Sequence, residues 1–373
     1  MPFSDLPKIL EVLKIEDNSQ LILINAIALS SLYYPSFAPD QRVLIFDLLP
    51  DKTLRRVCSL LKMIYSENHD CQILQKTAQS SWEICAAKIK DISEIKNSSM
   101  ILISPALASS SLEAFEDLVA HLRSPEGCPW DREQTHLTLR SNLLEETYEV
   151  IKALDENDIS GLMEEMGDLL LQIVLHSQIS NEAGEFNLSQ VIHGIYTKIV
   201  HRHPHVFEGI KVSSAKGVIH NWEVLKSAER EEHGKSDRQS ILSGVPTVMP
   251  ALSLAQEYQK RAARVGFDWS EVKPVLEKVY EELAELKEAD TQAQKEDELG
   301  DLLFAVVNLV RWYEVDAESA LRKMTGRFFQ RFNYIEENVR QQGRKLQEMK
   351  LAEMDSLWEE AKTRVSKTQR GDN

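Results

Sequence analysis

The chain has 373 residues, which is enough for two or three domains with ordinary hydrophobic cores. Its formal net charge is -16 at pH 7, and this acidic balance argues against a surface that binds nucleic acid or an anionic membrane. Hydrophobic residues make up 43% of the chain and charged residues 27%, so its composition is that of an ordinary globular protein.

Neither a targeting signal nor a membrane span is visible in the sequence. Residues 1–10 lack a basic segment followed by an apolar run, and the apolar stretch 21–29 is about half as long as a bilayer requires. No pair of cysteines is spaced C-x-x-C, so we expect reduced thiols at Cys58, Cys71, Cys85 and Cys128. These features predict a cytoplasmic protein without a membrane partner.

Residues 1–108 differ in pattern from the rest of the chain. The short apolar runs Val43–Phe46 and Met100–Ile103 are typical of buried strands, and residues 54–65 between them carry helical spacing. A strand, a helix and a strand indicate a small α/β segment. Neither strand is followed by a glycine-rich loop that would hold a phosphate, and the segment contains no candidate catalytic cluster.

From Leu112 onward the apolar residues recur at helical spacing. A first all-α domain is predicted over 109–232, a polar linker over 233–249, and a second all-α domain over 250–366. The predicted fold class is therefore mainly α, with two tandem helical domains preceded by a small α/β segment. The helices expected in the first domain lie near residues 112–122, 143–154, 165–175, 188–201 and 222–229.

The first domain contains two acidic motifs on neighbouring predicted helices. The first motif is E-E-x-x-E, with Glu146 and Glu149 three residues apart, and the second is E-x-x-D, with Glu165 and Asp168 at the same spacing. Each pair shares one face of its helix, so two antiparallel helices would bring four carboxylates together. Carboxylates that close raise one another's pKa unless they share a cation, and hard oxygen ligands favour Mg²⁺ or Mn²⁺.

A single acidic motif of this kind is more often an exposed helix face than a metal site. The second domain changes that balance, because it repeats both motifs in the same order. Its E-E-x-x-E motif contains Glu281, Glu282 and Glu285, and its E-x-x-D motif contains Glu298 and Asp301. Repetition over this length indicates duplicated domains.

Cationic and aromatic residues repeat after the acidic motifs in both domains. A pair of cations four residues apart is followed by a tryptophan with a lysine four residues later: Lys198, Arg202, Trp222 and Lys226, and then Arg327, Arg331, Trp358 and Lys362. Arginine and lysine can hold phosphate oxygens that a carboxylate repels. The combination predicts a nucleotide polyphosphate site that performs metal-assisted hydrolysis of a phosphoanhydride. For the tryptophans taken alone, core packing is the more common role.

Residues 112–232 and 250–365 resemble MazG-type nucleoside triphosphate pyrophosphohydrolase domains. The resemblance is carried by the acidic motifs, by Gly127–Asp131 and Arg202–Phe207 in the first domain, and by Val265–Trp269 in the second. It implies an all-α fold that forms a homodimer and splits nucleoside triphosphates into monophosphates and pyrophosphate with Mg²⁺. It also implies metal ligands at Glu282, Glu285, Glu298 and Asp301, and nucleotide contacts from Lys278, Glu281, Arg327, Arg331 and Trp358. Arg327 stands where a lysine is also common in the family, which keeps the charge.

Residues 18–108 resemble the C-terminal half of a tetrapyrrole methylase domain. The half that would bind the methyl donor is missing, so we expect a remnant or a docking segment without methylase activity.

Three functions remain open from the sequence. The leading hypothesis is a housekeeping nucleoside triphosphate pyrophosphohydrolase with broad base tolerance. The alternatives are a sanitiser with narrow nucleotide specificity and a non-catalytic nucleotide-sensing or protein-interaction module. We expect the second domain to carry most of the turnover, because Arg327 and Arg331 grip phosphate with two donors each.

Overall fold

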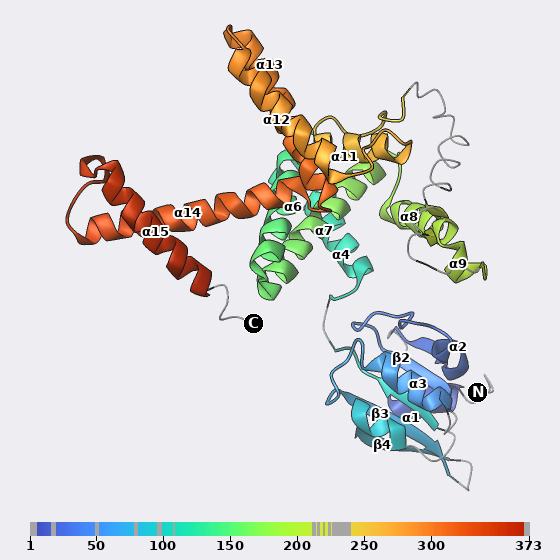
Figure 1. Cartoon of the computed structure of the whole chain (residues 1–373). Helices are drawn as coiled ribbons and strands as arrows, with labels where there is room; N and C mark the ends of the chain where they lie inside the picture. Colours follow the sequence, from blue (N-terminus) through green and yellow to red (C-terminus); the bar gives the residue numbers. More distant parts are fainter. Residues whose placement is uncertain are drawn as a thin grey trace. The chain divides into compact units, whose positions relative to one another are not determined.

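The computed structural model forms two compact units, Met1–Tyr196 and Thr197–Asn373. Figure 1 shows the helices and strands of the chain. Residues 94, 99 and 365–368 are described by their backbone alone. The residues that the structure describes are 6–15, 20–48, 52–77, 81–94, 99–106, 109–210, 214, 217–218, 221–222, 225 and 240–368.

The first unit opens with a mixed five-stranded sheet. Its strands are β1 (Ile22–Asn25), β2 (Val43–Leu48), β3 (Asp70–Lys76), β4 (Trp82–Lys88) and β5 (Ser99–Ile103). Their order in the sheet is β1-β2-β5-β3-β4, and β1 and β2 are parallel while the other neighbours are antiparallel. The prediction identified two of these strands. It did not identify the hairpin of β3 and β4, whose strands mix apolar residues with aspartate, glutamine, glutamate and lysine.

Both faces of this sheet are covered, which explains the apolar runs of its central strands. Val43 and Ile45 of β2 join the larger hydrophobic cluster with α2 (Ala26–Ser30) and α3 (Lys52–Leu61). Leu44 points to the opposite face, where it packs with Ile9 of α1 (Leu6–Leu13). The alternation of side chains along a strand therefore supplies two small cores, one on each face.

The remainder of the first unit is helical. It contains α4 (Leu112–Arg123), α5 (Pro129–Glu133), α6 (Arg140–Glu156), α7 (Ile159–Glu182) and the start of α8 (Leu188–Arg202), which runs into the second unit. Two residues separate α6 from α7: Asn157 adopts the left-handed conformation that ends α6, and the Asp158 carboxylate accepts a hydrogen bond from the Gly161 N–H to begin α7. So short a connection makes the two helices antiparallel neighbours.

The second unit repeats this arrangement with α11 (Ala251–Arg264), α12 (Val272–Glu288) and α13 (Gln292–Trp312). Thr291 and Gln294 form a capping box that begins α13 three residues after α12 ends. The unit also contains α9 (Pro204–Phe207), α14 (Ala317–Gln341) and α15 (Leu351–Thr368), and α14 packs along α15. The fold-class prediction is confirmed: the protein is mainly helical, with a small sheet in its N-terminal part. Among the described helices, none is long and apolar enough to cross a membrane.

Candidate functional site

The first acidic cluster lies where α6 packs along α7. Carboxylate oxygens of Glu146, Glu165 and Asp168 all lie within 4.8 Å of one another. Burial and the charges of Asp168 and Glu149 raise the pKa of Glu146. Burial also raises the pKa of Glu165, followed by charge repulsion and by a hydrogen bond that protonated Glu165 donates to Glu149. The fourth predicted member, Glu149, is outside the 4.8 Å group, but its charge still raises the pKa of Glu146 and Glu165.

The second acidic cluster lies at the equivalent place between α12 and α13. Carboxylate oxygens of Glu282, Glu285 and Glu298 lie within 4.8 Å of one another. Burial raises the pKa of Glu298, and the charges of Glu285, Glu282 and Asp301 raise it further. The same motifs therefore bring carboxylates together in both units, but not the same three: the second group includes Glu285, whose counterpart Glu149 is outside the first, and leaves out Asp301, the counterpart of Asp168.

Glu282 is the carboxylate that the protein buries most deeply in this cluster, with only 4% of its surface exposed. Its Oε1 accepts from Lys278 Nζ at 2.7 Å, and Lys278 also contacts Glu281 at 2.9 Å. Pairing with Glu282 and then Glu281 raises the pKa of Lys278, so this lysine stays charged. One lysine cannot offset three carboxylates, and the negative charge of the cluster remains in excess.

Two oxygens of the second cluster lack any hydrogen-bond partner within the described part of the chain. Oε2 of Glu282 and Oε2 of Glu298 are both buried and unsatisfied. A buried anionic oxygen without a donor or a cation is costly. A divalent cation with a preference for oxygen ligands would satisfy both atoms at once, so the residues present fit such an ion. The clusters are sites that could bind a metal.

A cavity of about 490 Å³ opens beside the second cluster. Lys278, Glu282 and Asp301 line it, together with residues of α11, of the loop 266–269 and of α13. Three of its aromatic residues keep much of their surface exposed: Phe267 (82%), Trp269 (42%) and Phe304 (48%). Its volume lies in the range of ordinary small-molecule sites, about 300–1,000 Å³. The cavity is therefore lined by charged side chains of the acidic cluster and by apolar aromatic side chains.

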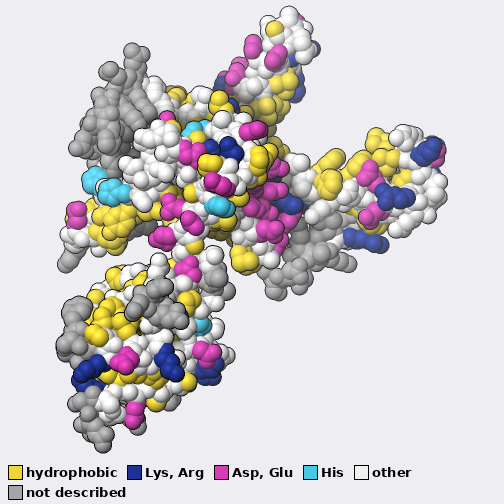
Figure 2. Space-filling view, turned by 180° about the vertical axis from the view of Figure 1, so that it is seen from behind, with side chains coloured by type: hydrophobic (Ala, Val, Ile, Leu, Met, Phe, Trp, Pro, Cys, Tyr) yellow, Lys and Arg dark blue, Asp and Glu magenta, His cyan; other side chains and the backbone are white. Residues whose placement is uncertain are grey.

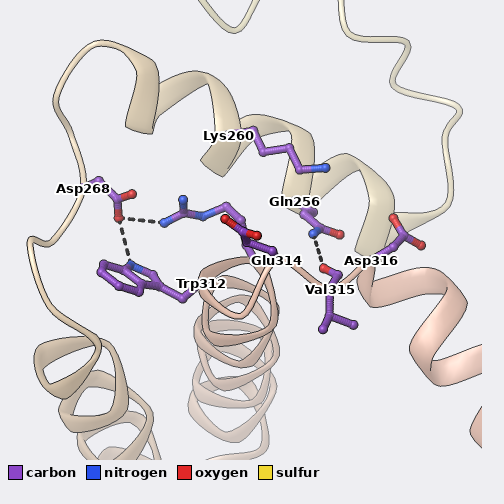
Figure 3. A pocket seen from close by; sticks show the side chains of 8 residues that line it. Gln256, Lys260, Asp268, Trp312, Glu314, Val315 and Asp316 are labelled. Atoms are coloured by element: carbon purple, nitrogen blue, oxygen red, sulfur yellow. Dashed lines mark hydrogen bonds and ion pairs between the residues drawn. The ribbon is translucent and has the colours of Figure 1, made fainter. Parts of the chain in front are cut away.

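Figure 3 shows a neighbouring cavity of about 540 Å³, which shares Asp268 and Arg311 with the first. Asp268 Oδ1 accepts from Arg311 Nη2 at 2.6 Å and from Trp312 Nε1 at 3.3 Å. Although burial favours the neutral acid, the hydrogen bond and charge of Arg311 lower the pKa of Asp268. Gln256 lies across this cavity, where its amide donates to Val315 O and accepts from Ala317 N. These contacts hold the loop 266–269 and the α13–α14 turn in place.

The cationic and tryptophan residues gather in a different part of the second unit. Arg331 lies over the ring of Trp358 at 5.5 Å, and Phe328 packs against the same ring with centroids 5.2 Å apart. Arg327 Nη2 contacts the sulfur of Met324 at 3.5 Å, and Lys362 pairs with Glu359. The corresponding arginine and tryptophan of the first repeat make the same contact: Arg202 lies 5.0 Å from the ring centroid of Trp222. Lys198 is exposed on α8, and Lys226 lies outside the described residues.

Within the second unit, these two groups of predicted residues are on separate arms. Figure 1 shows α12 and α13 projecting in one direction, and α14 with α15 in another. Among the described residues, Arg327 and Arg331 form no hydrogen bond or ion pair with the acidic cluster. Within a single chain, Lys278 and Glu281 therefore lie beside the carboxylates, whereas Arg331 and Trp358 do not.

Two buried polar residues of the 490 Å³ cavity, Gln259 and Asn308, were not predicted from the sequence. Gln259 and Asn308 are only 8% and 9% exposed, and both line this cavity with Arg311. Polar residues on amphipathic helices are ordinarily assigned to the exposed face. Their positions could have indicated burial, because both lie on the apolar face of their predicted helices and not on the opposite, polar face.

Comparison with known proteins places the chain in a family. Residues 134–207 match the MazG nucleotide pyrophosphohydrolase domain. A Thermotoga maritima protein named nucleoside triphosphate pyrophosphohydrolase/pyrophosphatase MazG is 46% identical over 251 residues, which are 66% of this chain and 95% of that protein. The nucleoside triphosphate pyrophosphohydrolase of Escherichia coli (strain K12) is 41% identical over 251 residues, or 66% of this chain and 94% of that protein.

A solved structure, the crystal structure of a mazG-related protein from Thermotoga maritima, covers 31% of this chain and 99% of its own. It has 29% sequence identity and a TM-score of 0.28. The resemblance of residues 18–108 to a tetrapyrrole methylase is not addressed by these relatives and stays a prediction. The MazG resemblance is confirmed, and the chain belongs to the MazG family of nucleotide pyrophosphohydrolases, which are hydrolases of phosphoanhydride bonds.

Proposed function

We propose that this protein hydrolyses nucleoside triphosphates to nucleoside monophosphates and pyrophosphate, with Mg²⁺ as cofactor, Mn²⁺ as a substitute and broad base tolerance. The observation that carries the proposal is the second acidic cluster, where buried oxygens of Glu282 and Glu298 have no partner among the described residues. The names of the Thermotoga and Escherichia relatives support the same activity. Its role would be the removal of nucleotides from the cellular pool.

In this proposal Glu282, Glu285, Glu298 and Asp301 hold the metal of the second unit, and Glu146, Glu149, Glu165 and Asp168 hold that of the first. The bound ion supplies positive charge that polarises the phosphoryl oxygens. Lys278 already lies against Glu282 and adds a fixed cation where the phosphates arrive. A carboxylate of the cluster that the ion does not fully occupy orients the attacking water and accepts its proton.

The remaining nucleotide contacts are proposed to come from a second copy of the chain. Arg327, Arg331, Trp358 and Lys362 lie on the arm of α14 and α15, away from the carboxylates of their own chain. Large apolar side chains on this unit are exposed, including Leu303 (60%), Leu321 (54%) and Phe329 (65%). Hydrophobic side chains are also visible on the helical surface in Figure 2. Pairing two chains would cover such residues. The equivalent contacts proposed for the first predicted domain, 109–232, are Lys198, Arg202, Trp222 and Lys226.

The proposed domains are 109–232 and 250–366, joined by the linker 233–249. The excess of acidic residues, part of which Figure 2 shows on the helices, supports the absence of a nucleic-acid partner. All four cysteines are unpaired, which supports the cytoplasm as the compartment.

We expect phosphorus NMR to identify nucleoside monophosphate and pyrophosphate as the first products. The protein would be incubated with Mg²⁺ and each of the common ribo- and deoxyribonucleoside triphosphates. Turnover of most of the panel supports the broad activity, whereas turnover of one nucleotide indicates a sanitiser. Binding without turnover would indicate a nucleotide sensor. Orthophosphate and nucleoside diphosphate as first products would refute the proposed cleavage position.

We also expect a protein that begins at Ser110 to keep most of its turnover. Residues 1–108 contain their own two hydrophobic clusters and none of the predicted site residues. The deletion removes Asp40, which accepts from the N–H and hydroxyl of Ser111 at 3.0 and 2.7 Å. Ser111 still accepts from the Ala114 N–H and begins α4. A loss above about tenfold, or about 1.4 kcal/mol of barrier, with the helical circular dichroism retained would show that the segment contributes to catalysis.

A further inference from the structure

Two buried glutamines of α11, Gln256 and Gln259, differ in how many hydrogen bonds their side-chain amides form. Both Gln256 and Gln259 reach across to a neighbouring helix, and both are nearly buried, at 3% and 8% exposed. Gln256 uses both ends of its amide, on Val315 O and Ala317 N. Gln259 uses only its nitrogen, which donates to Phe304 O at 2.8 Å. Because a carbonyl can only accept, this contact fixes the orientation of the Gln259 amide.

The side-chain oxygen of Gln259 therefore accepts no hydrogen bond from the described residues. Oε1 of Gln259 is buried and has no hydrogen-bond partner in the part of the chain that the structure describes. Gln259 lines the cavity of about 490 Å³ that also contains Glu282 and Asp301 of the acidic cluster. An unpaired buried acceptor costs free energy, which a ligand with an N–H group would recover.

Asn308 supplies the complementary group in the same cavity. Its Oδ1 accepts from Arg311 Nε at 2.8 Å, and Arg311 is itself held by Asp268 at 2.6 Å. The amide nitrogen of Asn308 is consequently the end left for a ligand, and among the described residues it makes no hydrogen bond. The cavity thus contains a fixed acceptor, on Gln259, and a fixed donor, on Asn308.

We propose that this cavity binds the nucleobase of the substrate, with Gln259 accepting from a base N–H and Asn308 donating to a base acceptor. The exposed rings of Trp269 and Phe304 provide apolar surfaces for a planar ligand. This assignment rests on the proposed function and deepens it. It also accounts for broad tolerance: adenine, cytosine, guanine and uracil each carry an N–H donor beside an acceptor on the edge used for base pairing. One acceptor and one donor suit all four.

The first unit lacks this arrangement. The E-x-x-D motifs align Asp168 with Asp301, an offset of 301 − 168 = 133, so Asn308 corresponds to Leu175. Leu175 is 4% exposed and packs in an apolar cluster with Val119 and Leu139. The same place in the first unit is therefore part of the core. A base site in one unit only is a further reason to expect more turnover from the second.

The test compares ATP with purine riboside triphosphate, which keeps the ring acceptor of adenine but lacks its amino group. For the wild-type full-length protein we expect kcat/KM to be about tenfold higher with ATP, the effect of one hydrogen bond to a buried acceptor. In Gln259→Leu that ratio should fall to about one. In Asn308→Leu, both substrates should lose about tenfold, mainly through KM, and the ratio should persist.

Gln172→Leu is the matched control. Gln172 is 4% exposed and has a buried, unpartnered Oε1, but it lies in the first unit and does not line this cavity. Its substitution should leave the ratio at the wild-type value. If Gln259→Leu fails to fold, the wild-type ratio and Asn308→Leu still decide the matter.

Equal use of ATP and purine riboside triphosphate by the wild-type protein would overturn the base assignment while leaving the hydrolase intact. No hydrolysis of any triphosphate would refute the proposed function and this assignment with it.

Discussion

Glu282→Gln combined with Glu285→Gln should lower kcat by more than about a hundredfold, which corresponds to at least about 2.7 kcal/mol of barrier. Glutamine keeps the shape of the side chain but removes the charge that holds a divalent cation. Glu282 is almost fully buried and has an oxygen without a partner among the described residues, so the substitution puts a neutral amide where a cation would be held. Steady-state hydrolysis of ATP measures the effect, and thermal unfolding checks that the fold persists.

The matched pair is Glu146→Gln with Glu149→Gln in the first unit, for which we expect a loss below about threefold. Three differences support this ranking. Glu146 is less buried than Glu282, Asn142 stands where the second unit has Lys278, and Leu175 fills the place of Asn308. If the first-unit pair abolishes activity and the second-unit pair does not, the assignment of the active unit is reversed.

Exhaustive removal of divalent ions with EDTA should reduce turnover to below about 1% of its starting value, since no other cation in the cluster offsets three carboxylates. Addition of Mg²⁺ or Mn²⁺ after the chelator is removed should restore activity, whereas K⁺ should not. Full activity in the chelated protein would contradict the metal site.

A second measurement separates binding from catalysis. Burial, and after it repulsion between the carboxylates, raises the pKa of Glu146, Glu165 and Glu298 in the folded protein. An ion bound only to the folded state relieves that repulsion and stabilises the fold. Mg²⁺ should therefore raise the unfolding temperature of the wild-type protein, and should raise it less when Glu282 and Glu285 are both glutamine.

Much of the helical architecture was predictable because it depends on local rules. Apolar residues at helical spacing identified the helices that carry the acidic motifs, and their boundaries follow from short-range signals such as Asp158 and the Thr291–Gln294 capping box. Two of the strands were predicted because they are buried on both faces and continuously apolar. The hairpin of β3 and β4 was missed because its strands are only partly apolar, and its pairing is set by contacts distant in sequence.

The sequence by itself determined which residues are chemically capable of the reaction. Carboxylates three residues apart share a helix face whatever surrounds them, and their repetition marked them as a set. Only the tertiary structure decided which of those residues meet. It brought Glu282, Glu285 and Glu298 together with Lys278, but left Arg331 and Trp358 on another arm.

The tertiary structure also added a difference between the two units that the sequence did not reveal. In the sequence, Gln259 and Asn308 are two polar residues among many, separated by 308 − 259 = 49 positions. Packing of α11 against α13 places both beside one cavity and pairs the Gln259 nitrogen with Phe304 O, while Arg311 of α13 itself pairs with the Asn308 oxygen. The other end of each amide is left without a partner in the described chain. Helical periodicity determines which face a side chain occupies, but the hydrogen bonds available to a buried amide depend on which helix packs opposite it.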